Sequence, residues 1–150
     1  MRIIDERDHS RRLLEEVLAR PLFAHLSTLH ENVPRESPVW FLWEDRCLWI
    51  VGNYKWDSFP KRIEKEPACA VGIVDFNPET GLVQHVGFRG RAFLEPQEAS
   101  RVERLFNRYM GEKERWDPRF QKVLGDRDWV FVRFEPETAV VRDQSYSVGE

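Results

Sequence analysis

The chain has 150 residues with a formal net charge of −3, and its two cysteines, Cys47 and Cys69, both lie in apolar runs. This length most simply forms one domain over residues 1–150, and the interspersed charges exclude a basic surface for nucleic acid. Because the N-terminus is charged, no apolar run approaches the ~20 residues of a membrane span, and buried reduced thiols are typical of the cytoplasm, we expect a cytoplasmic protein that does not enter a membrane.

The first predicted elements are a helix and a strand. Asp8 or Ser10 can cap the helix, Pro21 limits it, and its apolar stripe consists of Leu13, Leu14, Val17 and Leu18. Residues 23–29 then predict a strand, followed by a turn at residues 30–32. A helix with one apolar stripe lies on a surface, so we expect it to flank a sheet.

Two apolar runs, residues 39–43 and 47–51, flank the polar triplet 44–46. Aromatic and β-branched runs separated by turn residues predict a β-hairpin. Both runs, like a third at residues 68–74, are apolar at almost every position, so both faces of each strand need cover. A helix, a second subunit or a bound ring could supply it. Three such strands in a short chain favour a small barrel with a partner against its wall.

The segment after the hairpin carries a candidate phosphate site. Ser58 is a good helix N-cap, and Pro60 suits a first helical turn. Lys61 and Arg62 lie in the same turn, where the helix dipole also favours an anion, so a phosphate site is one interpretation. The other is a capped surface helix whose cations form weak local pairs with acidic neighbours: Lys61, Arg62 and Lys65 with Glu64 and Glu66.

The second half of the chain begins with a turn at residues 77–81 and a long strand at 82–94, which Gly87 and Gly90 soften as barrels require. The apolar stripe of residues 99–110 predicts an amphipathic helix.

A short capped helix follows between residues 117 and 125. Residues 129–134 and 138–141 predict two final strands separated by the polar segment 135–137. A polar tail, residues 143–150, follows the last of these strands.

Standard catalytic constellations are absent from the sequence. There is no Gly-x-Ser-x-Gly elbow, no glycine-rich phosphate loop and no Cys-x-x-Cys pair. The histidines lack the spacing of metal ligands: His9, His25, His30 and His85. We therefore predict neither a catalytic side chain nor a metal site.

In their order and spacing, these motifs resemble the FMN-binding split-barrel proteins related to pyridoxamine 5′-phosphate oxidase. The resemblance lies in a small-polar-Pro-Val-aromatic strand at residues 37–41, a hairpin return at 48–51 and a Ser…Lys loop at 58–61. An acid–proline pair at 66–67 and the apolar strand 68–74 complete it. It covers about half of the chain. It implies a mainly β fold, an antiparallel and Greek-key-like split barrel with flanking helices, and a homodimer with cofactor sites at the subunit interface.

The resemblance also implies where FMN would bind. Its phosphate would be held by a serine and two cations: Ser58, Lys61 and Arg62. The flavin ring would lie along one strand and the end of the next: Pro38, Val39, Trp40, Gly52 and Asn53. On the long strand the family often places a glutamine near the ring, and here His85 occupies that place with Gln84 beside it. Trp40 or Trp56 would pack on the face of the ring.

The sequence departs from the family at three points. Phe59 replaces the usual basic residue beside the serine, His85 replaces the glutamine, and the spacer from Lys61 to Pro67 is shorter than usual. The basic residues that a pyridoxal-phosphate substrate needs are also incomplete, so we do not expect that oxidase itself. The loop that carries Ser58 is therefore remodelled.

We expect an FMN-dependent oxidoreductase acting on a small molecule, because the flavin carries the redox chemistry and no protein nucleophile is needed. The alternatives are a reductase that uses the deazaflavin F420, a non-catalytic flavin or haem carrier, and a structural dimerisation domain without a cofactor.

Overall fold

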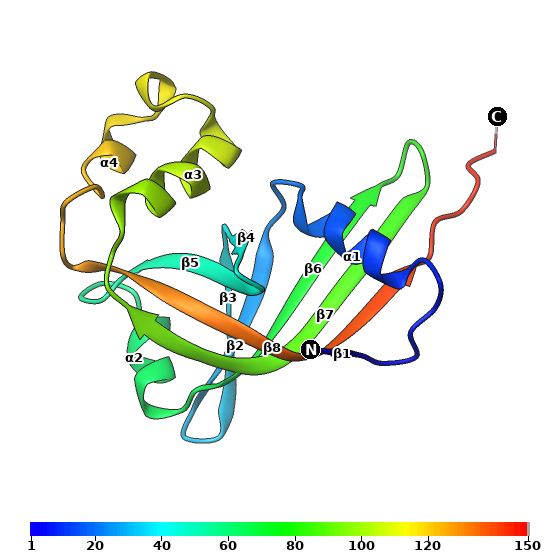
Figure 1. The fold of residues 1–150 in the computed structure, drawn as a ribbon, viewed down its shortest axis with the longest axis horizontal. Helices are drawn as coiled ribbons and strands as arrows, with labels where there is room; N and C mark the ends of the chain where they lie inside the picture. Colours follow the sequence, from blue (N-terminus) through cyan, green and yellow to red (C-terminus); the bar gives the residue numbers. More distant parts are fainter. Residues whose placement is uncertain (150) are drawn as a thin grey trace.

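The computed structural model describes residues 1–149, which form an eight-stranded and mainly antiparallel sheet flanked by helices (Figure 1). The strands are β1 (Arg2–Ile3), β2 (Ala24–His30), β3 (Val33–Val39), β4 (Leu42–Glu44), β5 (Cys47–Asn53), β6 (Ala68–Asn77), β7 (Leu82–Glu95) and β8 (Trp129–Asp143). The helices are α1 (Ser10–Leu18), α2 (Phe59–Lys65), α3 (Ala99–Met110) and α4 (Pro118–Gln121), with a 3₁₀ turn at Lys113–Arg115. These bounds confirm the predicted helices to within a few residues.

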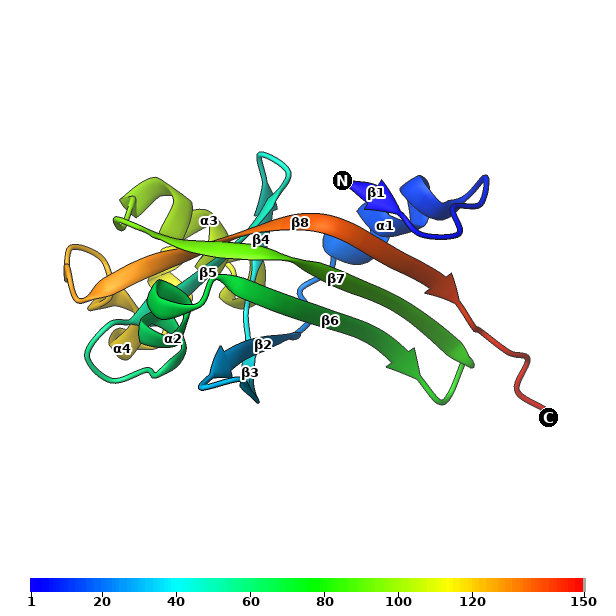
Figure 2. The ribbon, with the colours of Figure 1, turned by 90° about the horizontal axis from the view of Figure 1, so that it is seen from below.

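The strands follow the order β3-β2-β6-β7-β8-β5-β4, and the short β1 pairs in parallel with β8. The two edge strands, β3 and β4, are consecutive in the chain and are joined only by Trp40 and Phe41. The edges of the sheet are therefore held together by the chain itself, and the curved sheet encloses a core. Figure 2 shows β6, β7 and β8 running side by side along the length of the molecule.

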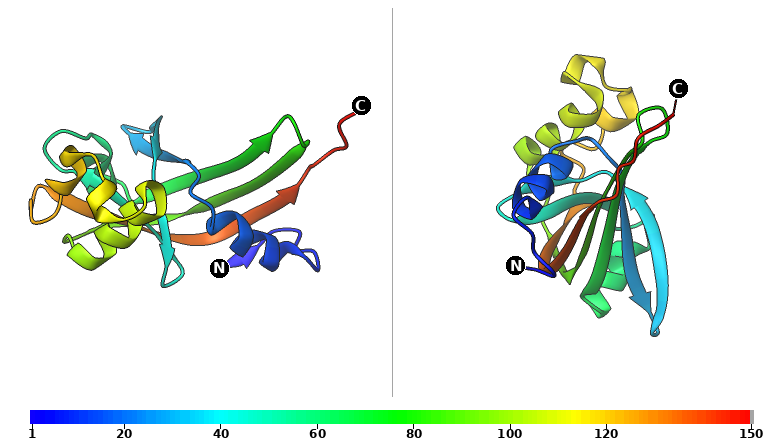
Figure 3. Two further views of the ribbon diagram at one scale, coloured as in Figure 1. Left: turned by 90° about the horizontal axis from the view of Figure 1, so that it is seen from above. Right: turned by 90° about the vertical axis from the view of Figure 1, so that its right-hand side faces the viewer.

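β5 is buried on both faces, as its apolar run requires. Leu48 and Ile50 point into the barrel core, whereas Cys47 and Trp49 join a second apolar cluster with residues of α3 and the segment after it. Figures 1 and 3 show α3 and α4 together at one end of the molecule, far from the C-terminus. The cover predicted for this strand is thus supplied by helices. None of the helices in residues 1–149 is long and apolar enough to cross a membrane.

β6 differs from β5, because only one of its faces is buried within the chain. Val71 and Ile73 point into the core, but Ala70, Gly72 and Val74 lie on the outer face and are partly or fully exposed. The sequence predicted cover on both faces of this strand. Within one chain the outer face stays open.

The predicted strand over residues 39–43 is wrong, because β3 ends at Val39 and β4 begins at Leu42. The Tyr109 hydroxyl explains the interruption: it accepts a hydrogen bond from the Phe41 amide (3.1 Å) and lies 3.3 Å from the Phe41 carbonyl oxygen. The backbone of Phe41 is therefore satisfied by a side chain, and its ring is fully buried in the core.

Two hairpins result from this interruption, and the predicted one survives in shortened form as β4–β5. The β2–β3 hairpin turns at Glu31 and Asn32, and the β4–β5 hairpin turns at Asp45 and Arg46. All four residues have positive φ, between 50° and 64°, as two-residue hairpin turns require.

The two predicted C-terminal strands are one 15-residue strand, β8. Pro136, which we expected to separate them, lies opposite Gly90, where the register shifts between Arg89 and Gly90. A Cβ atom at Gly90 would lie 2.0 Å from the Glu135 carbonyl oxygen, so the two strands approach too closely there for any side chain. This irregularity lets a proline sit inside a long strand without breaking it.

Candidate functional site

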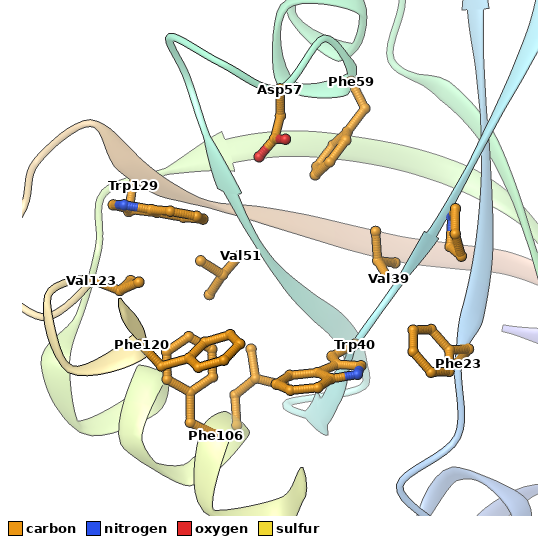
Figure 4. A pocket seen from close by; sticks show the side chains of 12 residues that line it. Phe23, Val39, Trp40, Val51, Asp57, Phe59, Phe106, Phe120, Val123 and Trp129 are labelled. Atoms are coloured by element: carbon orange, nitrogen blue, oxygen red, sulfur yellow. The ribbon is translucent and has the colours of Figure 1, made fainter. Parts of the chain in front are cut away.

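A cavity of about 370 Å³ lies between the ends of β3 and β5, the loop before α2, and the α3–α4 segment (Figure 4). Val39 and Val51 line it from the sheet. Most of the wall is aromatic: Phe23, Trp40, Phe59, Phe106, Phe120 and Trp129. We call this site the aromatic cavity. Its size and apolar lining are those of a pocket for a ring-bearing small molecule.

Trp40 is held in the wall by other aromatic rings. It stacks on Tyr109 (centroids 4.5 Å apart, planes at 6°) and on Phe120 (5.5 Å, 20°). The Tyr109 hydroxyl in turn donates to the Leu22 carbonyl oxygen (2.6 Å). Trp40 is therefore a fixed part of the wall and already has stacking partners. Trp56, the other ring expected to pack on a ligand, is 79% exposed and does not line the cavity.

The loop after β5 presents Asp57 to the cavity (Figure 4). Asp57 Oδ2 accepts a hydrogen bond from the Asn53 amide (2.7 Å), and the Asp57 amide donates to the Asn53 carbonyl oxygen (2.9 Å). Asn53 is buried, and its Oδ1 accepts from the amides of Lys55 and Trp56. The Asn53 side chain thus stabilises its own loop. The Asn53 backbone also fixes the carboxylate of Asp57, which is the charged group that reaches the cavity.

Phe59 enters the cavity from the first residue of α2. Together with Pro60 and Ile63 it is buried, which anchors the short helix on the sheet. Gly52 makes this possible, because a Cβ atom there would lie 2.8 Å from the Phe59 ring. Gly52 therefore contributes to the site by admitting this ring.

A second pocket, of about 430 Å³, lies beside α2 and is lined by Ser58 and several cations. We call these cations the basic cluster: Arg35, Lys61, Arg62 and Lys65. Arg62 Nε donates to Thr28 Oγ1 (2.8 Å), which orients its guanidinium. Burial and the neighbouring charge of Arg35 lower the pKa of Arg62. The fold thus holds the positive charges of Arg35 and Arg62 close together.

Two carboxylates, Glu31 and Glu66, line the same pocket as the basic cluster, and Glu64 lies beside them in α2. Glu64 Oε1 accepts from the Tyr54 hydroxyl (2.6 Å), and Glu66 Oε1 accepts from the Ala68 amide (3.3 Å). Within residues 1–149, no ion pair shorter than 4.0 Å includes a member of the basic cluster. The predicted weak pairs with Glu64 and Glu66 therefore do not form, and the cluster is suited to attract an anion.

Three consecutive residues contribute to the linings of the two pockets. Asp57 and Phe59 line the aromatic cavity, whereas Ser58 between them lines the pocket of the basic cluster. Six of the ten residues predicted for the cofactor site line one of these pockets: Pro38, Val39 and Trp40 the first, and Ser58, Lys61 and Arg62 the second.

Gln84 and His85 line neither of these two pockets, so their expected position beside the ring stays a prediction. Gln84 faces inward and accepts a hydrogen bond from Arg20 Nη1 (2.6 Å), which also pairs with Asp75 (2.9 Å). His85 points to the opposite face, into a shallow groove of the outer sheet surface. Adjacent residues of a strand point to opposite faces, so within one chain only one of the two side chains faces a given side of the sheet.

The sequence did not identify Asp57 as a residue of the site, and among the aromatic residues that line the cavity it identified only Trp40. Phe106 was recognised as part of the apolar stripe of a helix, but the stripe does not reveal which strand it covers. For Asp57 a signal existed: it directly precedes the helix cap that was singled out. No group of three metal-ligating side chains is close enough to hold an ion in the described residues.

Neither the family models nor the curated proteins include a match to this sequence, but solved structures match it. A conserved hypothetical protein from Mycobacterium tuberculosis has a TM-score of 0.73 at 17% identity, covering 98% of both chains. An F420 reductase has a TM-score of 0.65 at 25% identity, covering 83% of this chain and 94% of its own. A candidate pyridoxamine 5′-phosphate oxidase from Listeria innocua has a TM-score of 0.66 at 17% identity, covering 93% and 100%. The chain therefore has the split-barrel fold, as predicted.

Proposed function

We propose that this chain is an FMN-dependent oxidoreductase related to pyridoxamine 5′-phosphate oxidase, acting on a small molecule. The flavin ring would occupy the aromatic cavity, and the phosphate would lie at the basic cluster. The observation that supports this proposal most directly is that consecutive residues, 57–59, line both an apolar, aromatic pocket and a pocket whose cations form no ion pair within residues 1–149. A ligand with a planar ring and an anionic tail needs such a pair of neighbouring environments.

The spacing along β3 fits the same ligand. Arg35 lies in the basic cluster and Val39 lines the aromatic cavity, and four strand residues span about 13 Å at 3.3 Å per residue. That is the scale of a ring system with a phosphorylated side chain. The ring would rest on Val39 and Val51, and its tail would pass the start of α2 toward Ser58.

In this proposal the chain binds, orients and shields, and the bound flavin supplies the electron-transfer chemistry. Lys61 and Arg62 would neutralise the phosphate through charged hydrogen bonds. The aromatic wall would exclude water from the ring, which strengthens the polar interactions that remain. None of these roles needs a nucleophile or a general base from the protein.

The deazaflavin F420 is the second candidate cofactor. The likeness to an F420 reductase has the highest sequence identity among the three structures compared, 25%. The basic cluster, moreover, holds four cations, more than one phosphate needs. A cofactor with a longer anionic tail would use the additional cations.

We also propose that the chain acts as a homodimer with its cofactor sites near the subunit interface. The outer face of β6 and β7 holds a shallow groove with small residues, including Ala70, Gly72 and Gly87, beside the larger His85 and Arg89. This face is the one that the chain leaves without cover. The small residues of this groove would allow a second sheet to approach closely.

The absorption spectrum of the purified protein, with mass spectrometry of any released small molecule, tests the proposal. A flavin spectrum that a nicotinamide reductant bleaches would support the oxidoreductase. A flavin that no donor reduces would indicate a carrier, and a haem spectrum a haem carrier. Colourless protein that takes up neither FMN nor F420 would contradict the proposal.

A further inference from the structure

Asp57 is the charged side chain in the lining of the aromatic cavity, among the residues that the structure describes. Its Oδ2 accepts the hydrogen bond from the Asn53 amide, and its Oδ1 takes part in no hydrogen bond within residues 1–149. No cation of that part of the chain lies within 4.0 Å: Lys55, the basic residue of the same loop, pairs with Asp128 instead (3.1 Å). A carboxylate oxygen is thus left facing an apolar space without a donor.

A carboxylate in such a wall discriminates between ligand groups. It accepts a hydrogen bond from an N–H, and it repels carbonyl and phosphate oxygens. Leaving it without a donor when a ligand displaces water would cost free energy, since an unsatisfied charged group pays its full desolvation penalty. The occupant of the cavity should therefore present an N–H group to Asp57.

We propose that Asp57 fixes the orientation of the cofactor ring by accepting a hydrogen bond from the imide N–H of that ring. This inference rests on the proposed function and adds to it a positioning residue. Flavins and deazaflavins both carry this N–H, between two carbonyl groups on one edge of the ring, so the inference holds for either cofactor. The apolar edge of a flavin then lies against the aromatic wall.

The surroundings of Asp57 support a positioning role in two ways. Its carboxylate is fixed before any ligand binds, through the reciprocal hydrogen bonds with the buried Asn53. Its charge also opposes that of the basic cluster across residues 57–59. An anionic tail is therefore repelled from the aromatic cavity and attracted to Lys61 and Arg62, and both effects select the same orientation.

Ring-only probes test the inference without the phosphate. Lumiflavin carries the imide N–H, and 3-methyllumiflavin replaces it with a methyl group. In the wild-type chain the methyl group should weaken binding about tenfold or more, the loss expected when a charged acceptor is left unpaired. The Asp57→Asn variant should bind lumiflavin about tenfold more weakly than the wild type does. Its affinities for lumiflavin and 3-methyllumiflavin should then differ by less than about twofold.

Asp128→Asn is the matched control, because Asp128 is an acid that contacts the same loop from outside the cavity. It should discriminate between the two probes as the wild type does, and melting temperatures should show that both variants fold. Equal discrimination by Asp57→Asn and the wild type, or tighter lumiflavin binding by Asp57→Asn, would overturn this inference alone. A wild-type chain that binds neither lumiflavin nor FMN would overturn the inference together with the proposed function.

Discussion

Gly52 and Phe59 approach each other so closely that only a hydrogen atom fits between them: a Cβ atom at residue 52 would lie 2.8 Å from the ring of Phe59. Gly52 is near the end of β5, and Phe59 is the first residue of α2. The position of the Phe59 ring in the cavity wall therefore depends on the absence of a side chain at Gly52 in β5.

We expect Gly52→Ala to push the Phe59 ring toward the cavity. Overpacking of this kind costs about 1–3 kcal/mol, so the melting temperature should fall, and FMN should bind more weakly because the cavity shrinks. Thermal unfolding and a fluorescence titration with FMN measure the two effects. Gly72→Ala is the control, since nothing lies within 4 Å of its added Cβ atom. Equal melting temperatures and affinities for the two variants would contradict this account.

Removing two members of the basic cluster should show how much the phosphate, as distinct from the ring, contributes to FMN binding. In Lys61→Ala/Arg62→Ala we expect FMN affinity to fall more than tenfold, because hydrogen bonds to charged groups contribute about 1.5–3 kcal/mol each. Riboflavin, which lacks the phosphate, should lose less than about twofold. Isothermal titration of both ligands gives the comparison.

The control for that pair is Arg11→Ala/Arg12→Ala, which removes two adjacent and exposed cations of α1. It should leave both affinities unchanged. If Lys61→Ala/Arg62→Ala weakened riboflavin and FMN equally, the phosphate would not lie at the basic cluster.

Local parts of the site could be predicted from the sequence, because neighbours in sequence stay neighbours in space. Ser58, Lys61 and Arg62 share one short helix start, and they line one pocket. The opposite wall of the aromatic cavity could not be predicted in this way. Phe120 and Trp129 come from elements more than 60 residues later. The packing of the α3–α4 segment over β5 places Phe120, and the pairing of β8 with β5, where Trp129 lies opposite Asn53, places Trp129.

The strands show the same division between local and distant information. The patterns of β6 and β7 were sufficient to predict both, whereas the break at Phe41 depends on the hydroxyl of Tyr109, a residue of a distant helix. Counting back from Gly90 predicts that His85, with Gln84 beside it, lies near the ring. That count finds the strand position but not which face of the barrel meets the cavity.

Glu44 should make stability depend on pH. Its carboxylate accepts from Arg104 Nε (2.7 Å) and Arg101 Nε (3.1 Å), which ties β4 to α3 and the cavity wall. The hydrogen bond from Arg104, followed by that from Arg101, lowers the pKa of Glu44 against the opposing effect of burial. Because the folded-state pKa is lower than the unfolded one, the stabilisation is present above the unfolded pKa and is lost as the pH falls through the folded pKa.

At pH 7 we therefore expect Glu44→Gln to lower the free energy of unfolding by about 0.5–1 kcal/mol, the scale for partly exposed ion pairs. The difference from the wild type should shrink as the pH falls below the unfolded-state pKa of the carboxyl, and it should vanish below the lowered folded-state pKa, where the wild-type carboxyl is also protonated. Urea unfolding at a series of pH values measures it. A difference that stays constant down to acid pH would show that charge is not its cause.

The two cysteines should be inert in the folded chain. Both Cys47 and Cys69 are buried, and burial raises the pKa of Cys69 to about 12 and also raises that of Cys47. Since the thiolate is the reactive form, a thiol reagent at pH 8 should label neither residue until the protein unfolds, and then both. Rapid labelling of native protein would contradict the burial described here.

Gly72 offers a direct test of the dimer. It lies in the middle of the outer face, paired with His25 on β2 and with Gly87 on β7, and nothing lies within 4 Å of a Cβ atom added there. An arginine at this position can therefore extend outward without disturbing the fold of one chain. Between two packed sheets, however, it would bury a charge without a partner, which costs several kcal/mol.

We expect the wild type to sediment as a dimer and Gly72→Arg as a folded monomer with a nearly unchanged melting temperature at low protein concentration. Gly72→Ser, which adds a small side chain to the same face, should remain dimeric. If the cofactor site needs the second subunit, FMN affinity should fall in Gly72→Arg and persist in Gly72→Ser. A monomeric wild type would contradict the proposed dimer. A dimeric Gly72→Arg would place the partner surface elsewhere, because no close sheet-to-sheet contact can accommodate that guanidinium at its centre.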